Sequence, residues 1–373
     1  MFDQSSIDFL KQLSEAFGPP GFEREPVRLL RDYVSPHCDE VRTDKLGSLL
    51  FSRRGTAQRP CVLLPGHIDE VGFIVAGITK QGFISFNPVG GWFDQVLLAQ
   101  RVRLRTRAGT LEGVIASKPP HLLDAEERRK VVKLEKMFID IGASSRQEVE
   151  AMGVRIGDPI VPDSSFSTLT KPVFDDQVRT GEATLCMGKA FDDRIGVFMA
   201  AEVLRRLAVE GIAHPNTVIG AGTAQEEVGL RGARTTAWIA EPDVCITLEV
   251  DIANDVAGMD HDLAPIKLGG GPTILTYDSS MVPNQGLKEL VIDTAEDAQI
   301  PYQLSMIRRG GTDAGVIHIS GPGCPCTVLG VPTRHIHSHV ALLNLDDVER
   351  CIELVIAVVQ RLDVATVEGF TAI

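Results

Sequence analysis

Residues 217–232, TVIGAGTAQEEVGLRG, combine a small apolar run with two adjacent glutamates. The apolar run has the length and composition of a strand buried on both faces of a sheet. Glu226 and Glu227 follow directly at its exit. Adjacent carboxylates repel each other and lose hydration in such a place, so another group must compensate for both charges.

Strands and helices alternate around this stretch, which predicts an α/β fold. The expected strands are 61–64, 216–224, 244–250, 302–308 and 326–332. The expected helices are 5–16, 25–34, a long amphipathic one at 192–210, 284–299 and 345–362. This alternation indicates a central, mostly parallel sheet covered by helices.

Between residues 71 and 173 the chain changes to short β-like runs separated by glycine and proline. That pattern predicts a small β-rich module inserted into the α/β domain. We therefore expect a first part of the α/β domain at 1–70, the insertion at 71–173 and a second part at 174–373. Within the insertion, the charged segment 121–136 is expected to be a mobile surface loop or helix.

Composition limits the class of partner. The chain has 373 residues, 44% of them hydrophobic, and a formal net charge of −13, which argues against nucleic acid or an anionic membrane as a partner. No apolar run is long enough for a transmembrane helix, and the first residues indicate a helix and not a signal peptide. Seven scattered cysteines fit a reducing cytoplasm.

Five connections beside the predicted strands and the helix at 192–210 carry imidazole or carboxylate groups. These groups are His67 and Asp69, Asp192 and Asp193, Glu226 and Glu227, Asp251, and the triplet His335, His337 and His339. In open α/β sheets such groups meet at the carboxyl ends of the strands. Oxygen and nitrogen donors without thiolate suit zinc, cobalt or manganese. Because the donors exceed one tetrahedral site, we expect two metals that share a carboxylate.

Several of these groups also have ordinary structural explanations. His67 can be a capped surface histidine; as a metal ligand, it would have its ring oriented by Asp69. Asp192 and Asp193 suit the start of a helix, where carboxylates meet free N–H groups.

The later segments leave similar alternatives open. Asp251 can be a turn residue, and Glu249 competes with it as the ligand from that strand. One or two of the three histidines can be structural. Ser338 lacks the G-x-S-x-G context of a nucleophile.

A metal site explains the glutamate pair. One carboxylate can bind a metal while its neighbour holds a water that bridges the metals. A general base must lie close to that water without being consumed as a ligand, and adjacent positions on a turn provide this separation.

The chain resembles the tetrahedral aminopeptidase family, which includes glutamyl aminopeptidases and proteins once labelled endoglucanase M. The resemblance runs nearly end to end. It is carried by PGHIDEVGFIV, ASKPPHLL, MFIDIGASS, GDPIV, KAFDDRIG, AQEEVGLRGA, RGGTDAG and PTRHIHS. It implies a metallopeptidase α/β domain interrupted by a PDZ-like β-barrel.

The resemblance also implies a role for each site residue. His67 and Asp251 would complete one metal site, Glu227 and His337 the other, and Asp192 would bridge them. Glu226 would be the general base, and Asp69 would orient His67. The implied cofactors are two divalent ions, zinc or cobalt, with manganese also possible. The implied assembly is a homododecamer built from dimers around an inner chamber that admits short peptides.

The expected function is a dinuclear metal-dependent aminopeptidase that removes N-terminal residues from short peptides through a metal-bridging water activated by Glu226. The alternatives are a metal-dependent deacylase or amidohydrolase acting on N-acylated small molecules and a non-catalytic binding protein.

Two departures from the family bear on specificity. His339 stands where relatives commonly have proline, and the turn Leu268-Gly269-Gly270-Gly271-Pro272 lacks the lysine that many carry. His121 and His335 receive no role.

Overall fold

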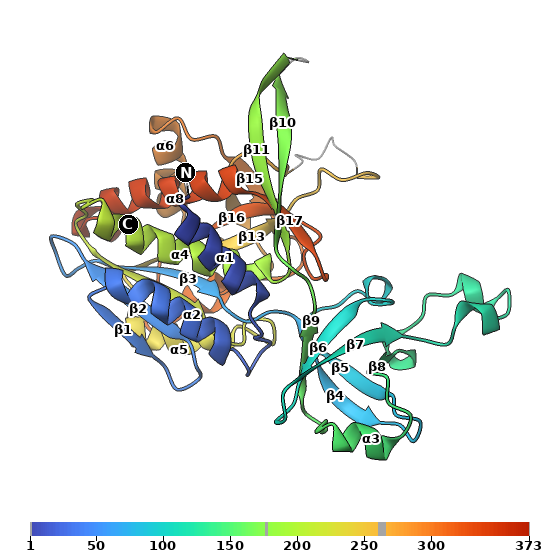
Figure 1. Cartoon of the computed structure of the whole chain (residues 1–373). Coiled ribbons are helices and arrows are strands. Elements are labelled where there is room, and N and C mark those ends of the chain that lie inside the picture. The colour runs from blue at the N-terminus through green and yellow to red at the C-terminus, as the bar shows by residue number, and fades with distance from the viewer. Residues whose placement is uncertain (1, 176–177, 260–265, 373) are drawn as a thin grey trace.

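The computed structural model describes residues 2–175, 178–259 and 266–372 (Figure 1). It contains an α/β domain built on an 11-stranded sheet and, beside it, a closed barrel of six strands. The predicted fold class, an α/β domain interrupted by a β-barrel, is therefore confirmed.

The centre of the large sheet is parallel. Its central strands are β12 (Thr217–Thr223), β3 (Cys61–His67), β13 (Val244–Ile252) and β16 (Cys326–Arg334), in that spatial order. Antiparallel strands flank them: β1 (Glu40–Thr43) and β2 (Leu49–Arg54) on one side, and β17 (Ala341–Asn344), β11 (Val178–Gly188) and β10 (Ser167–Asp175) on the other. β14 (Thr273–Tyr277) pairs with β16 and with β15 (Gln303–Met306). The four central strands therefore end at one edge of the sheet.

Helices cover the sheet. They are α1 (Gln4–Glu15), α2 (Arg24–Val34), α4 (Phe191–Val209), α5 (Arg231–Ala240), α6 (Gln285–Asp297), α7 (Ala314–Ile317), α8 (Leu345–Arg361) and α9 (Val364–Gly369). The predicted helix at 192–210 is α4, but its polar side chains are not solvated as an amphipathic pattern predicts. Glu202 is fully buried and Arg206 nearly so, because α4 lies against β3 and β13 and is also contacted by α1 and α8.

The barrel closes in the order β4 (Gly72–Ile78), β5 (Ile84–Val89), β8 (Phe138–Asp140), β7 (Thr110–Ala116), β6 (Arg101–Arg105) and β9 (Pro159–Pro162). Closure leaves no strand edge unpaired within it. Phe73, Val102 and Ile139 are fully buried inside. The outer segment 121–136 contains only short 3-10 turns, Pro120–Leu122, Glu127–Arg129 and Leu134–Lys136, and α3 (Arg146–Ala151) follows β8.

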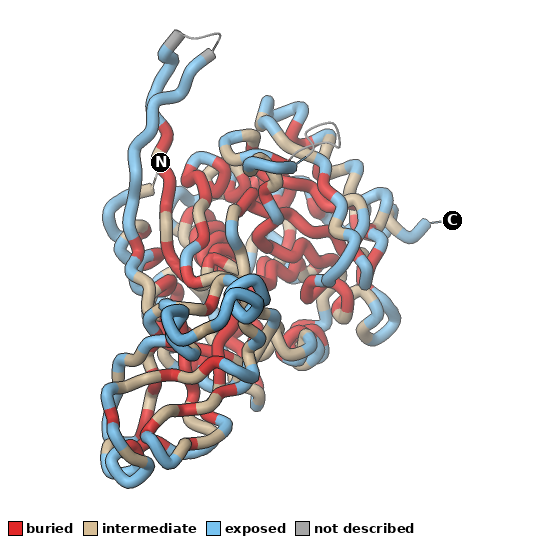
Figure 2. Tube along the Cα trace, turned by 90° about the vertical axis from the view of Figure 1, so that its right-hand side faces the viewer, coloured by how far each residue is buried: buried red, intermediate tan, exposed pale blue. Residues whose placement is uncertain are grey.

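The hairpin of β10 and β11 projects from the large sheet (Figures 1 and 2). Exposed apolar residues on it include Leu169, Val173 and Phe174. The expected domain boundary at 173 falls inside β10, a strand of the large sheet, whereas the barrel strands end at Pro162. We therefore propose that the insertion runs from residue 71 to a point between 162 and 167.

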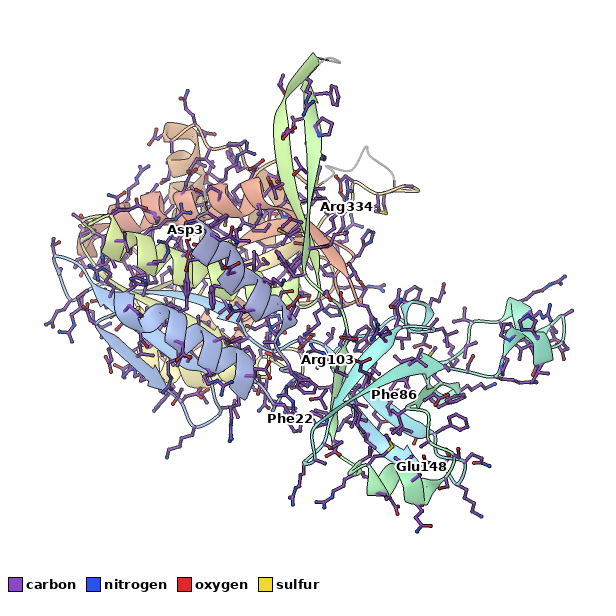
Figure 3. The ribbon with its side chains drawn as sticks, viewed as in Figure 1. Asp3, Phe22, Phe86, Arg103, Glu148 and Arg334 are labelled. Atoms are coloured by element: carbon purple, nitrogen blue, oxygen red, sulfur yellow. The ribbon has the colours of Figure 1, made fainter. Side chains whose placement is uncertain are left out.

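Arginines of the barrel contact the α/β domain, and Figure 3 places Arg103 at this junction. Arg103 donates to the carbonyl oxygen of Glu15 at 2.7 Å. Arg105 lies 2.6 Å from Glu25, and its guanidinium stacks 4.0 Å from the centre of the Phe17 ring. These contacts anchor the barrel to α1, to α2 and to the loop between them. Among the described helices, none is long and apolar enough to cross a membrane.

Candidate metal centre

The carboxylate of Asp192 lies between two histidine rings. His67 ends β3, and its Nε2 atom lies 3.1 Å from Asp192 Oδ1. His337 follows β16, and its Nε2 atom lies 3.2 Å from Asp192 Oδ2. Burial raises the pKa of Asp192, but the contacts with His337 and His67 outweigh it and hold that pKa well below its ordinary value. One carboxylate therefore faces two imidazoles, one through each oxygen.

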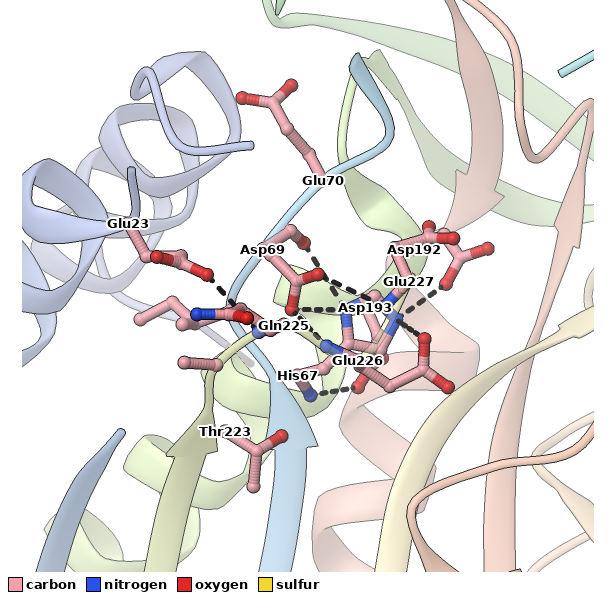
Figure 4. A network of polar contacts seen from close by, with 12 residues as sticks. Glu23, His67, Asp69, Glu70, Asp192, Asp193, Thr223, Gln225, Glu226 and Glu227 are labelled. Carbon is pink, nitrogen blue, oxygen red and sulfur yellow. Dashed lines mark hydrogen bonds and ion pairs between the residues drawn. The ribbon is translucent and has the colours of Figure 1, made fainter. Parts of the chain in front are cut away.

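Asp69 holds the turn that carries the glutamate pair. Its Oδ1 atom accepts a hydrogen bond of 2.9 Å from the backbone N–H of Glu226, and its Oδ2 atom accepts one of 3.1 Å from that of Glu227. Oδ1 also lies 3.6 Å from Nδ1 of His67, and the side chain is fully buried. Figure 4 shows this carboxylate beside the His67 ring and the turn. Asp69 thus positions both the histidine and the glutamates.

The two glutamates approach different histidines. Glu226 Oε2 lies 3.8 Å from Nε2 of His67, and Glu227 Oε1 lies 3.5 Å from Nε2 of His337. Burial raises the pKa of Glu227 to about 8, and the negative charge of Asp192 adds to the shift. Burial also raises the pKa of Glu226 well above its ordinary value. Both carboxylates are held where a negative charge is costly without a nearby cation.

Glu249 is the residue of β13 that joins the cluster. One of its oxygens lies within 4.8 Å of a ring nitrogen of His67, and its side chain lines the cleft. The predicted ligand Asp251 does neither. Burial raises the pKa of Asp251, while the hydroxyl groups of Ser305 on β15 and Thr273 on β14 lower it. The Oδ1 atom of Asp251 accepts a hydrogen bond of 2.8 Å from the backbone N–H of Ile252. Asp251 belongs to neither group of clustered donor atoms, so the structure does not bring it to the cluster.

Asp193 supports the centre through the backbone. Its Oδ2 atom accepts a hydrogen bond of 3.0 Å from the N–H of His67, and its Oδ1 atom accepts one of 2.9 Å from the N–H of Gly196. Its donor atoms also come within 4.8 Å of His67 and Glu249. Because both oxygens already accept backbone hydrogen bonds, we interpret Asp193 as the link between α4 and the end of β3.

A buried ion cluster beside the site was not predicted. Lys189 Nζ lies 2.6 Å from Glu70 Oε2, and a terminal nitrogen of Arg194 lies 3.1 Å from Glu70 Oε1. Arg194 also donates to the carbonyl oxygens of Leu13 and Ala16, which anchors the end of α1. All three charged residues lie within the motifs PGHIDE and KAFDDR. The available signal was that the motifs carrying His67 and Asp192 also contain these three further charged residues.

The other histidines considered in the sequence analysis, His121, His335 and His339, lie outside the cluster. His335 and His121 are exposed. His339 is buried, with its ring centre 5.5 Å from that of Trp92 in the insertion, and burial lowers its pKa to about 4. The hydroxyl of Ser338 donates to the carbonyl oxygen of His335 at 2.6 Å. That hydrogen bond makes Ser338 part of the loop structure.

The donor set fits divalent cations. Two groups of three residues have donor atoms within 4.8 Å of one another: His67, Asp192 and Glu227, and His67, Asp193 and Glu249. Among the described residues, Oε1 of Glu227 is buried and has no hydrogen-bond partner. A buried, unpaired carboxylate oxygen close to imidazole nitrogen is an arrangement that a metal ion satisfies. The cluster opens into a cleft of about 550 Å³.

Comparison with known proteins agrees with this geometry. Residues 47–354 match the family described as M42 glutamyl aminopeptidase. The putative aminopeptidase FrvX of Escherichia coli (strain K12) is 38% identical over 367 residues, which cover 98% of each chain. A TET aminopeptidase from the marine sediment archaeon Thaumarchaeota archaeon SCGC AB-539-E09 is 55% identical, with a TM-score of 0.92 over 98% of this chain and 99% of that one.

A third similar protein is the TET1 peptidase of Pyrococcus horikoshii, which can assemble into a tetrahedron or a large octahedral shell. It is 29% identical, with a TM-score of 0.80 over 96% of this chain and 100% of that one. The sequence match, the shared fold and the His–carboxylate cluster agree. The chain therefore belongs to the M42 glutamyl aminopeptidase family and is a peptidase.

Proposed function

We propose that the chain is a dinuclear metal-dependent aminopeptidase that removes N-terminal residues from short peptides. The observation that carries this proposal is the Asp192 carboxylate, whose two oxygens face His67 and His337 at 3.1 and 3.2 Å. In our assignment Asp192 is the bridging ligand. His67 and Glu249 complete one site, and His337 and Glu227 complete the other. Glu249 thus replaces Asp251 in the set expected from the sequence.

Two divalent ions, zinc or cobalt with manganese also possible, would polarise the scissile carbonyl and lower the pKa of the attacking water. Glu226 takes the proton from that water and returns it to the leaving amine. Two observations support this role. Burial raises the pKa of Glu226, which makes its carboxylate a stronger base. Glu226 is also not one of the proposed metal ligands, so its carboxylate is available to accept a proton.

The negative charge of the cleft explains why the enzyme would select substrates with a free amino terminus. The cleft beside the cluster is lined by Glu226, Glu227 and Glu249, and carboxylates favour the ammonium group of an unblocked peptide. An N-acylated substrate has no such charge. The deacylase alternative therefore predicts the opposite selectivity, hydrolysis of N-acetylated and not of unblocked substrates.

Glu226→Gln tests the mechanism. We expect a loss of kcat of about 10²- to 10⁴-fold with unchanged metal content, because the glutamine cannot accept the proton. Glu210→Gln, on the exposed end of α4, is the matched control and should behave as wild type. Both variants are assayed on unblocked and N-acetylated tripeptides, and their metal content is measured by elemental mass spectrometry. Full activity of the Glu226 variant at full metal content would refute the role of Glu226.

We further propose a homododecamer built from dimers, in the cytoplasm. The shell formed by the TET1 peptidase of Pyrococcus horikoshii supports the assembly. All seven cysteines are free, which supports a reducing compartment. Native mass spectrometry tests the assembly, and a dominant dimer at micromolar concentration would contradict the dodecamer.

A further inference from the structure

Two chemically different kinds of side chain line the cleft. The proposed ligands and Glu226 are carboxylate and imidazole groups, whereas Ile252, Ile307 and Ile336 are aliphatic and Arg309 is cationic. We call the part of the lining formed by these last four residues the second half of the cleft. Ile252 is 53% exposed although it ends a strand that is otherwise buried. Ile307 and Ile336 are half-buried. Covering the apolar wall, the surface that these three isoleucines leave accessible, with an apolar group gains free energy.

Glycines leave room along this wall. Gly229 has a φ of +121°, and a Cβ atom built on it would meet nothing within 4 Å. Gly310 has a φ of +103°, and its Cβ would meet only Ile307, at 3.9 Å. Both conformations disfavour any other residue, and both positions open onto free space. The second half of the cleft can therefore hold a side chain of the substrate.

Charge on this half of the cleft comes from Arg309. Among the described residues that line the cleft, every carboxylate belongs to the metal cluster or is Glu226. Arg309 is exposed and forms no hydrogen bond or ion pair with any described residue. A lysine or arginine side chain entering here would meet the like charge of Arg309, and the described lining offers it no carboxylate other than the metal cluster and Glu226. A glutamate side chain would form one exposed ion pair with Arg309, which strengthens binding by about fivefold at most. Its carboxylate would also lose hydration beside the isoleucines.

We propose that this half of the cleft binds the side chain of the N-terminal residue of the substrate, and that it selects aliphatic side chains such as leucine, isoleucine, valine and methionine. This inference rests on the proposed aminopeptidase function and names its substrate class. Ile252, Ile307 and Ile336 form the apolar surface. Arg309 excludes cationic side chains.

The first experiment compares kcat/KM of the metal-loaded enzyme for Leu-, Glu- and Lys-p-nitroanilide. We expect the leucyl substrate to exceed the other two by about tenfold or more, since burying one methylene alone contributes about 10- to 200-fold in such pockets. A preference for the lysyl or glutamyl substrate would overturn this inference and leave the aminopeptidase intact. Hydrolysis of no unblocked substrate with zinc, cobalt or manganese would instead overturn the proposed function.

Charge reversal tests the role of Arg309. Arg309→Glu should raise the ratio of lysyl to leucyl kcat/KM by about threefold to tenfold, because a repulsion becomes an attraction. Arg308→Glu is the matched control. It makes the same change of charge at the preceding residue, which is exposed and does not line the cleft. An equal change in both variants, or no change in either, would overturn the assignment.

Ile252→Asp tests the apolar wall. Its kcat/KM for the leucyl substrate should fall by about tenfold or more at unchanged metal content. Ile156→Asp, at an exposed isoleucine of the insertion, should leave it unchanged. Because Ile252 is exposed, this variant should fold. Unaltered leucyl kinetics in Ile252→Asp would exclude the wall as the specificity determinant.

Discussion

Replacing Asp69 with asparagine should weaken catalysis and metal binding together. The aspartate accepts backbone hydrogen bonds from Glu226 and Glu227 and approaches His67. Asparagine keeps the shape and one acceptor oxygen. Its amide nitrogen, however, replaces one of the two acceptor oxygens. The N–H groups of that nitrogen would then face a backbone N–H of the turn, so two donors would meet with no acceptor. One hydrogen bond to a charged acceptor is lost, and a backbone donor is left unsatisfied.

The magnitude follows from that loss. A hydrogen bond to a charged group contributes about 1.5–3 kcal/mol. If the loss appears fully in the positioning of Glu226 and Glu227, kcat/KM falls by about 10- to 150-fold. Residues that orient metal ligands typically change affinity or activity by about 10- to 100-fold. We therefore expect a defect of one to two orders of magnitude in both quantities.

The assay measures kcat/KM on an unblocked peptide, zinc affinity by competition with a chelator, and the free energy of unfolding. Asp44→Asn is the matched control. Asp44 Oδ1 accepts backbone hydrogen bonds of 2.9, 2.7 and 2.8 Å from Leu46, Gly47 and Ser48, in a turn that does not line the cleft. It should lose stability and keep wild-type kinetics and metal affinity. If Asp69→Asn shows that same pattern, Asp69 is only structural and our reasoning is refuted.

Three further outcomes are expected. Glu249→Gln should lose one metal ion per subunit, whereas Asp251→Asn should keep both, as elemental analysis would show; the reverse result would restore Asp251 as the ligand. Burial raises the pKa of Glu23 from its ordinary 4.5 to about 7, so the folded chain holds a proton that the unfolded chain releases between these pH values. The contribution of Glu23 to stability should therefore fall by up to about 3 kcal/mol as pH rises through this window. Glu23→Gln should reduce the slope by that amount in denaturation curves of metal-free protein, where Glu226 and Glu227 add to the slope in the same direction. A slope that Glu23→Gln leaves unchanged would refute the assignment to Glu23. Zinc or cobalt at 100 times its Kd should raise the free energy of unfolding by about 2.7 kcal/mol, reversibly with EDTA, whereas an unchanged melting temperature would argue against a metal centre.

The parallel core of the sheet could be predicted because its strands are local, apolar and bounded by turn residues. The predicted segments at 61–64, 244–250 and 326–332 lie within observed strands, and the one at 216–224 extends one residue beyond each end of β12. The hairpin of β10 and β11 was missed as a unit of the large sheet. Most of its described side chains are exposed, so hydrophobic periodicity does not distinguish it from the strands of the insertion.

The site could be predicted as a set of strand ends but not in every ligand. Glu249 and Asp251 are two residues apart on one strand, so alternation points both to the same face. The distinction depends on the surroundings of each side chain in the fold: Glu249 lines the cleft, whereas the pKa of buried Asp251 is set by burial and by Ser305 and Thr273, which come from strands remote in the sequence. The pattern of one strand contains no information about those surroundings.

The positions of the proposed ligands along the chain bear on biosynthesis. They extend from His67 to His337, and five separate segments contribute them. A growing chain that has not yet released His337 from the ribosome has an unfinished cluster, even when the barrel and the first strands have folded. Competence to cut peptides is therefore acquired only when nearly the whole polypeptide has been synthesised.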